Sequence, residues 1–285
     1  MRLIIISGMS GSGKSVALHA LEDLDFYCID NLPIGMLPAF SVQILSTPNS
    51  QYENFAVGID VRNLSGDLSI FPELISQMRK NDLHCDVIFL DAEDKTLIKR
   101  FSETRRKHPL TGDGTSLPNA IQDERKMLDP ITSYADLVFD TTRYTVHQLR
   151  ELIRKRIQGT DKSSLSLMFE SFGFKHGTPV DANFVFDIRC IPNPYWVPEL
   201  RGLTGRDQPV MEYLDRFDAV QKMYNDLRQY LEHWIPAFAA ENRTYLTIAI
   251  GCTGGQHRSV YLVERLAAHF ANSNHDVITH HRDLS

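Results

Sequence analysis

Short apolar runs alternate with amphipathic stretches over the first 157 residues of the chain. The apolar runs predict β-strands at Leu3–Ser7, Phe26–Ile29, Phe55–Ile59, Val87–Leu90 and Leu137–Phe139. Between these runs, apolar residues recur every three or four positions, which predicts helices near 14–24, 34–46, 68–80, 94–107, 119–128 and 145–157. Because strands alternate with helices, we expect a parallel sheet with crossover helices, the α/β class.

The pattern breaks at residues 158–164, a short polar segment without aromatic side chains. This segment predicts a linker between a first domain, residues 1–157, and a second domain, residues 165–285. The second domain has predicted strands at Leu165–Phe172, Asn183–Ile188, Tyr245–Ile250 and Val277–His280, and predicted helices near 209–233 and 259–271. We therefore expect it to be α/β as well.

The composition is that of a soluble globular protein, with 42% hydrophobic and 23% charged residues in a chain of 285. No apolar run approaches the roughly 20 residues of a membrane span, and the first strand follows Met1-Arg2 directly, so we expect a cytoplasmic protein without signal peptide or anchor. The four cysteines form no C-x-x-C pair, which favours reduced thiols over structural zinc. The net charge of −6 gives no general attraction to nucleic acid.

The segment Gly8-Met9-Ser10-Gly11-Ser12-Gly13-Lys14-Ser15 matches the phosphate-binding pattern G-x-x-x-x-G-K-[ST] at every position. It lies between the first predicted strand and the first predicted helix, which is the context that such a P-loop requires. The glycines let backbone N–H groups point at phosphate oxygens, a solvent-facing Lys14 adds positive charge, and Ser15 can bind Mg²⁺. A glycine-rich turn without a ligand is the alternative.

Asp60 and Asp91 each end a predicted strand and would lie at the carboxyl edge of the sheet, where such sheets bind ligands. Either carboxylate could hold Mg²⁺ or orient a water, and a solvated turn is the alternative for each. The helix after Asp91 and the loop at 108–114 resemble the lid of small-molecule P-loop kinases. The basic residues of this segment are Lys95, Lys99, Arg100, Arg105, Arg106 and Lys107, and a solvated basic helix face is the alternative.

A second glycine-rich segment, Gly251-Cys252-Thr253-Gly254-Gly255-Gln256-His257-Arg258-Ser259, separates a strand from a helix in the second domain. Its glycines free the backbone to surround an anion, and His257 and Arg258 are charge-assisted donors beside a helix N-terminus. Asp187 and Arg189 follow another strand of this domain and could contact sugar hydroxyls and phosphate. The segment predicts a second phosphate or anion site.

The spacing from Cys252 to Arg258 and Ser259 also satisfies C-x-x-x-x-x-R-[ST], the loop of tyrosine phosphatases, in which a thiolate attacks phosphorus. Gly251 stands where such loops usually have a histidine, and no general-acid aspartate loop stands out. We therefore favour a small, buried and inert Cys252, and keep a phosphatase as a rival function.

Taken together, these segments resemble the RapZ family of nucleotide-binding RNase adapter proteins over nearly the whole chain. The resemblance rests on both glycine-rich segments and on five others, namely Cys28–Pro33, Asp60–Asn63, Phe186–Arg189, Pro192–Trp196 and Leu203–Gly205. The P-loop alone is common among proteins, but this set in this order is specific.

The resemblance implies binding of ATP and GTP, with Mg²⁺ and weak hydrolysis, at residues 8–15 and at a second nucleotide contact formed by Asp60, Val61, Arg62 and Asn63. It also implies a second domain similar to a phosphofructokinase subdomain that senses glucosamine 6-phosphate. The residues expected at that sugar-phosphate site are Asp187, Arg189, Cys252, Thr253, Gly254, Gly255, His257, Arg258 and Ser259.

Some members of the family bind a small regulatory RNA through the second domain and present it to an endoribonuclease, which controls glucosamine-6-phosphate synthase. The resemblance implies these partners here too, and we further expect a homo-oligomer. A small-molecule P-loop kinase, which would transfer phosphate to an acceptor, is the alternative function.

The end of the chain differs from that of the RNA-binding members, which have a tail rich in lysine and arginine. This chain ends His280-His281-Arg282-Asp283-Leu284-Ser285, and Gln256 stands where a lysine is familiar. Phosphate neutralisation dominates affinity for nucleic acid, so fewer positive charges weaken RNA binding. His275, His280 and His281 lack the partners and spacing of a metal site and are expected on the surface.

Overall fold

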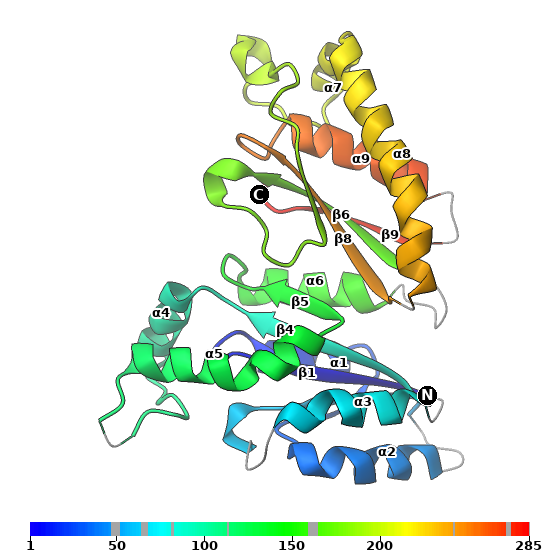
Figure 1. Ribbon diagram of the computed structural model, residues 1–285. Coiled ribbons are helices and arrows are strands. Elements are labelled where there is room, and N and C mark those ends of the chain that lie inside the picture. Colours follow the sequence, from blue (N-terminus) through cyan, green and yellow to red (C-terminus); the bar gives the residue numbers. More distant parts are fainter. Residues whose placement is uncertain are drawn as a thin grey trace. The chain divides into compact units, whose positions relative to one another are not determined.

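The structure is a computed structural model that describes residues 1–46, 52–63, 68–80, 83–112, 114–158, 165–241, 243–271 and 275–284 (Figure 1). The chain divides into two compact units, Met1–Gln158 and Gly159–Ser285. Residues 159–164 of the predicted linker lie outside the described residues, as does Asp113 of the predicted lid loop. No helix in the described part of the chain is long and apolar enough to cross a membrane.

The first unit contains a five-stranded parallel sheet in the order β2-β3-β1-β4-β5. Its strands are β1 (Arg2–Gly8), β2 (Tyr27–Ile29), β3 (Asn54–Gly58), β4 (His84–Asp91) and β5 (Leu137–Asp140). Its helices are α1 (Lys14–Glu22), α2 (Leu37–Ser46), α3 (Phe71–Lys80), α4 (Asp94–Thr104), α5 (Leu117–Tyr134) and α6 (Val146–Gln158), and single 3-10 turns form at Ile34–Met36, Val61–Asn63 and Leu68–Ile70.

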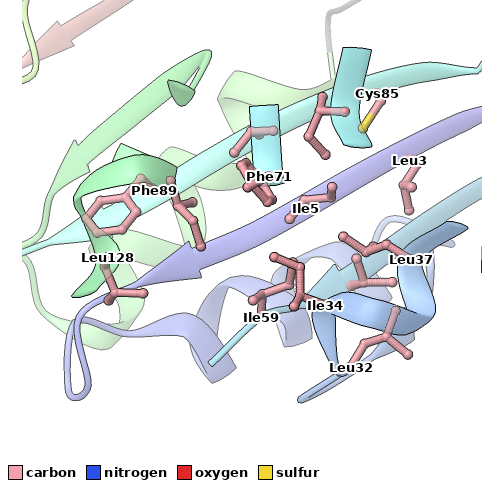
Figure 2. Close-up of a cluster of buried hydrophobic side chains, with 14 of the residues drawn as sticks. Leu3, Ile5, Leu32, Ile34, Leu37, Ile59, Phe71, Cys85, Phe89 and Leu128 are labelled. Atoms are coloured by element: carbon pink, nitrogen blue, oxygen red, sulfur yellow. The ribbon is translucent and has the colours of Figure 1, made fainter. Parts of the chain in front are cut away.

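The central strand β1 is buried along its whole length because helices pack against both faces of the sheet. Leu3 and Ile5 point into a cluster with Leu37, Phe71 and Leu128, which come from α2, α3 and α5 (Figure 2). The alternate residues of β1 point to the opposite face, where α1 packs. The loop that follows β1 therefore leaves a fixed strand at the carboxyl edge of the sheet, between β3 and β4.

The second unit contains a four-stranded parallel sheet in the order β7-β8-β6-β9. Its strands are β6 (Ser166–Gly173), β7 (Phe184–Asp187), β8 (Tyr245–Cys252) and β9 (Asp276–His281). Helices α7 (Gln208–Asp215), α8 (Asp218–Ala240) and α9 (Arg258–Phe270) share one apolar core with the sheet (Figure 1). Single 3-10 turns form at Phe174–His176, Pro194–Trp196 and Pro198–Leu200.

The α/β class with parallel sheets predicted from the sequence is confirmed, but several helix boundaries differ, and three of the differences have a clear local description. The helix predicted at 209–233 is two helices, because Phe217 takes an extended backbone and packs its ring against the core. The helix predicted at 94–107 ends at Thr104, because Arg105 adopts the left-handed conformation. The helix predicted at 119–128 runs from Leu117 to Tyr134 and passes through Pro130.

Candidate functional site

The P-loop connects β1 to α1 and turns sharply at three glycines. Gly8, Gly11 and Gly13 have φ values of 146°, 86° and 110°, a region that other residues rarely adopt. A Cβ atom on Gly8 would also lie 2.2 Å from the carbonyl oxygen of Leu90 in β4. The glycines of the motif are thus required by the backbone of the apo loop, before any ligand is considered.

Several amides of this loop donate to no group among the described residues. The N–H groups of Met9 and Ser12 donate to carbonyl oxygens, and that of Ser10 donates to the carboxylate of Glu124. The remaining amides, those of Gly11, Gly13, Lys14 and Ser15, have no such partner in the described ranges. They lie at the N-terminus of α1, where unpaired N–H groups and the helix dipole favour an anion.

Lys14 is more enclosed than the sequence predicts, with a side chain only 10% exposed. Its Nζ atom donates to the carbonyl oxygens of Gly8 at 2.7 Å and Met9 at 3.3 Å. The same atom lies 3.6 Å from Oδ2 of Asp60. In this arrangement the ammonium group of Lys14 is bound by carbonyl oxygens of its own loop and lies near the Asp60 carboxylate. These groups supply the negative charge that a phosphate would supply in a complex.

Asp60 follows β3 and is the carboxylate nearest to the P-loop lysine. Burial raises the pKa of Asp60, but the charge of Lys14 and the hydrogen bonds from Arg62 outweigh it, so the pKa lies below its ordinary value. Arg62 donates to Asp60 through its backbone N–H at 3.0 Å and through its guanidinium at 3.2 Å. Val61 is buried, and the side chain of Asn63 lies outside the described residues. The segment 60–63 therefore begins beside the lysine of the P-loop.

Asp91 ends β4, the strand on the other side of β1, and its carboxylate has different partners from that of Asp60. Its Oδ2 atom lies 2.6 Å from a guanidinium nitrogen of Arg125, and its Oδ1 atom accepts from the N–H of Ala92. Arg125 also binds Asp94. Of the two predicted carboxylates, only Asp60 lies within 4 Å of the P-loop lysine in the described structure.

Three side chains from distant segments brace consecutive residues of the P-loop, and the sequence analysis missed this role for each of them. Glu124 of α5 binds Ser10, Arg100 of α4 donates to the carbonyl oxygen of Gly11 at 3.1 Å, and Thr141 donates to that of Ser12 at 2.8 Å. Arg100 also binds Thr141, at both the hydroxyl and the carbonyl oxygen. Of the predicted lid residues, Arg100 thus supports the loop, while Arg105, Arg106 and Lys107 are exposed beyond the end of α4.

In the second unit the structure brings together the ends of three parallel strands. The glycine-rich segment begins at the last two residues of β8, Asp187 ends β7 with Arg189 two residues beyond it, and the 3-10 turn at 174–176 follows β6. The backbones are joined because the N–H of Ile188 donates to the carbonyl oxygen of Gly251 at 3.0 Å. A Cβ atom on Gly173 would lie 2.6 Å from the backbone of Gly254, so these loops can touch only through glycine.

The residues predicted at this second site divide into exposed and buried groups. Thr253, Gly254, Asp187 and Arg189 reach the surface, whereas Cys252, Gly255, His257, Arg258 and Ser259 are buried. Asp187 and Arg189 form an ion pair with each other at 2.6 Å, and the Arg189 guanidinium lies over the Phe174 ring. Lys175, which the sequence analysis did not select, has its Nζ atom 3.9 Å from the position of a Cβ atom on Gly254.

Arg258 supports the loop from beneath, with only 4% of the residue exposed. Its guanidinium donates to the carbonyl oxygens of Arg189 and Ile191 and to the hydroxyl of Thr253. Its Nε–H group is buried and has no hydrogen-bond partner in the described part of the chain. A buried donor without a partner costs free energy.

His257 and His281 differ from their predicted roles. His257 is buried, its Nε2 atom lies 3.0 Å from the carbonyl oxygen of Leu200, and burial lowers its pKa below the ordinary value. His281, predicted on the surface, has a side chain 5% exposed that binds Ser171 at 2.8 Å and Glu264 at 2.9 Å. Arg282 donates to the carbonyl oxygen of Gly177, so the end of the chain packs onto the unit.

Comparison with known proteins gives matches over the whole chain. A model of the RapZ-like N-terminal domain matches residues 1–161, and a model of the RapZ C-terminal domain matches residues 165–285. A protein of Thioalkalivibrio sulfidiphilus that is named a nucleotide-binding protein is 54% identical over 286 residues, which cover both chains completely. A protein of Nitrosococcus oceani with the same designation is 54% identical over 285 residues, again with complete coverage.

Solved structures match the first unit at low identity. Shikimate kinase from Bacteroides thetaiotaomicron is 14% identical with a TM-score of 0.38, covering 55% of this chain and 98% of its own. Deoxyadenosine kinase from M. mycoides with bound dATP is 18% identical with a TM-score of 0.35, covering 55% of this chain and all of its own.

Proposed function

Since the chain belongs to the RapZ family, we propose that its first unit binds a nucleoside triphosphate through the P-loop between β1 and α1. The observation that carries the proposal is the set of four unpartnered amides, those of Gly11, Gly13, Lys14 and Ser15, at the N-terminus of α1. The ammonium group of Lys14 lies beside them. Relatives 54% identical over the whole chain carry the name nucleotide-binding protein, which supports the same assignment.

ATP and GTP are the nucleotides we propose, in complex with Mg²⁺ and with slow hydrolysis, as the family resemblance implies. The exposed Ser15 hydroxyl would hold Mg²⁺ together with phosphate oxygens and water, and Asp60 would face this metal shell. Among the described residues, no three or more His, Cys, Asp or Glu side chains form a group that could hold a metal ion. A contact of residues 60–63 with GTP remains part of the proposal.

Replacement of Lys14 tests the proposed nucleotide binding. Lys14→Ala should lower the affinity for Mg-ATP and Mg-GTP by about 1.5–3 kcal/mol or more, because it removes a charged hydrogen-bond donor. Lys126→Ala is the matched control, since the Lys126 side chain is 76% exposed on α5. Calorimetric titration measures both affinities, and circular dichroism confirms the fold. A folded Lys14→Ala protein with unchanged nucleotide affinity would exclude the P-loop as the binding site.

The second unit is proposed to sense glucosamine 6-phosphate at the loop 252–259. The supporting observation is the loop geometry, with exposed Thr253 and half-buried Gly254 at the tip and Lys175 beside Gly254. Asp187 and Arg189 would contact the sugar from the neighbouring strand end. The family resemblance supplies the identity of the sugar.

By the same resemblance, this unit would bind a small regulatory RNA and present it to an endoribonuclease. Arg282 packs onto the fold, and the exposed cations Lys175 and Arg189 lie on this unit, where they would contact RNA phosphates.

A further inference from the structure

Beneath the P-loop, the carboxylate of Glu124 joins two segments that are far apart in the sequence. Glu124 is fully buried in α5. Its carboxylate oxygens accept from the backbone N–H of Ser10 at 3.0 and 3.1 Å and from the Ser10 hydroxyl at 2.6 Å. The Oε2 atom also lies 2.9 Å from Nε2 of His108, in the loop after α4.

The hydrogen-bond pattern fixes the proton on His108. The backbone N–H of Leu110 donates to Nδ1 of His108 at 3.1 Å, so Nδ1 is an acceptor and carries no proton. Nε2 therefore carries the proton and donates to Glu124. Both oxygens of the buried carboxylate are thus held by donors, two from Ser10 and one from His108. A buried carboxylate that loses one of its donors is left short of hydrogen bonds, which is costly.

A second contact links the same loop to the P-loop. The His108 ring lies 5.0 Å from the Phe101 ring, centroid to centroid. Phe101 in turn lies against Gly11, because a Cβ atom on that glycine would be 3.4 Å from the Phe101 ring. His108 is therefore in contact, through one partner each, with both Ser10 and Gly11.

The three residues before His108 are the exposed basic segment Arg105–Lys107. Arg105 ends α4 in the left-handed conformation, and all three side chains lie in solvent. The segment is attached at one end to α4 and at the other to the buried His108. A movement of the Ser10 peptide is transmitted to Glu124 and then to His108, because the hydrogen bonds that join them are buried and costly to break.

We propose that Glu124 and His108 are positioning residues that couple the basic segment Arg105–Lys107 to the occupancy of the P-loop. The inference rests on the proposed binding of a nucleotide in that loop. A nucleotide that fixes the loop fixes Ser10, and through Glu124 and His108 it orders the segment from which Arg105, Arg106 and Lys107 reach solvent. By linkage, ordering that segment also favours the nucleotide-binding form of the loop.

Trypsin measures this coupling directly, because it cleaves after Arg105, Arg106 and Lys107. In the full chain, saturating Mg-ATP or Mg-GTP should slow cleavage at these sites, mapped by mass spectrometry, by about tenfold, since cleavage requires local opening. In Glu124→Gln, tested at the nucleotide concentration that saturates this variant in a calorimetric titration, we expect the slowing to be lost. The amide retains an oxygen for Ser10, but its NH2 group would face the Nε2–H of His108, so the coupling contact becomes a clash of two donors.

Asp123→Asn is the matched control, because it makes the same charge change one residue away on α5 at a side chain 58% exposed, and it should keep the full slowing. A second pair of variants, at His108, tests the coupling if Glu124→Gln folds poorly. His108→Gln keeps a donor for Glu124 and should retain most of the slowing, whereas His108→Leu should lose it.

The outcomes distinguish a failure of the proposed nucleotide binding from a failure of the proposed coupling. A wild-type protein that binds no nucleotide contradicts the proposed function, and the coupling falls with it. A wild-type protein that binds nucleotide and is protected from trypsin, together with a Glu124→Gln or His108→Leu variant that is protected equally, overturns the coupling alone.

Discussion

At the scale of single residues, the surroundings of Cys252 argue against a nucleophile. Its Sγ atom lies 3.2 Å from the hydroxyl of Ser259 and accepts from the N–H of Gly255 at 3.2 Å. Such contacts would suit a thiolate, but Cys252 is only 3% exposed. The guanidinium of Arg258 donates to two backbone carbonyl oxygens. The side chain holds the loop together from inside, which is the role expected from its sequence context.

Paired variants separate this account from the rival phosphatase. Cys252→Ser should leave the affinity for glucosamine 6-phosphate unchanged. Arg258→Ala should lower it by about 1.5–3 kcal/mol, because it removes a charged donor and the support of the 189–191 turn. Affinity by calorimetry and hydrolysis of a generic phosphoester are the measurements, with thermal unfolding to confirm that each variant folds. Hydrolysis by the wild type that disappears in Cys252→Ser would make the second unit an enzyme.

The site residues that could be predicted from the sequence are those that belong to one continuous motif. Gly8 through Ser15 form one continuous pattern, and the chain does place them between a strand and a helix. Glu124, Arg100 and Thr141 could not be found in this way, because they contact the P-loop from 89 to 129 positions away in the sequence. The sequence does not show whether a single glutamate on an amphipathic helix is buried and hydrogen-bonded to a loop or exposed to solvent.

At the scale of elements, all nine predicted strands form, because buried parallel strands are continuous apolar runs with clear ends. Helix ends were less predictable. The break between α7 and α8 depends on the ring of Phe217 fitting the core, which is a tertiary effect. The surface position predicted for His281 was wrong for a similar reason, since β9 pairs with β6 and α9 covers its side chain.

The buried His281 makes the attachment of β9 sensitive to acid. Burial lowers the pKa of His281, although its hydrogen bond to Glu264 opposes the shift. The unfolded chain therefore takes up this proton at a higher pH than the folded one. The stability that His281 contributes is present above about pH 6.5 and is lost as the pH falls through the lower folded value.

We therefore expect His281→Gln to make the free energy of unfolding less dependent on pH as the pH falls below about 6.5. At pH 7.5 the same variant should lose about 1 kcal/mol, from the hydrogen bonds to Ser171 and Glu264. Chemical denaturation across this range is the measurement, and His233→Gln, at an exposed position on α8, is the control. An unchanged pH slope in His281→Gln would assign the acid sensitivity to other groups.

At the scale of the whole molecule, the chain carries two glycine-rich loops of similar design in separate compact units. Each follows a buried parallel strand, turns on glycines and ends at the N-terminus of a helix, α1 in one unit and α9 in the other. Family models cover both units, and relatives 54% identical extend over the full length. The central claim is that the first of these loops holds the phosphates of a nucleotide.

The most direct test follows the backbone amides of that loop by NMR while Mg-ATP is titrated into the ¹⁵N-labelled full chain. The account predicts saturable shifts of the Gly11, Gly13, Lys14 and Ser15 signals, because their N–H groups are the ones left for the phosphates. The signals of Thr253 and Gly254, in the other loop, should saturate separately or not move. Saturable binding of Mg-ATP that leaves all four P-loop amides unmoved would contradict the account.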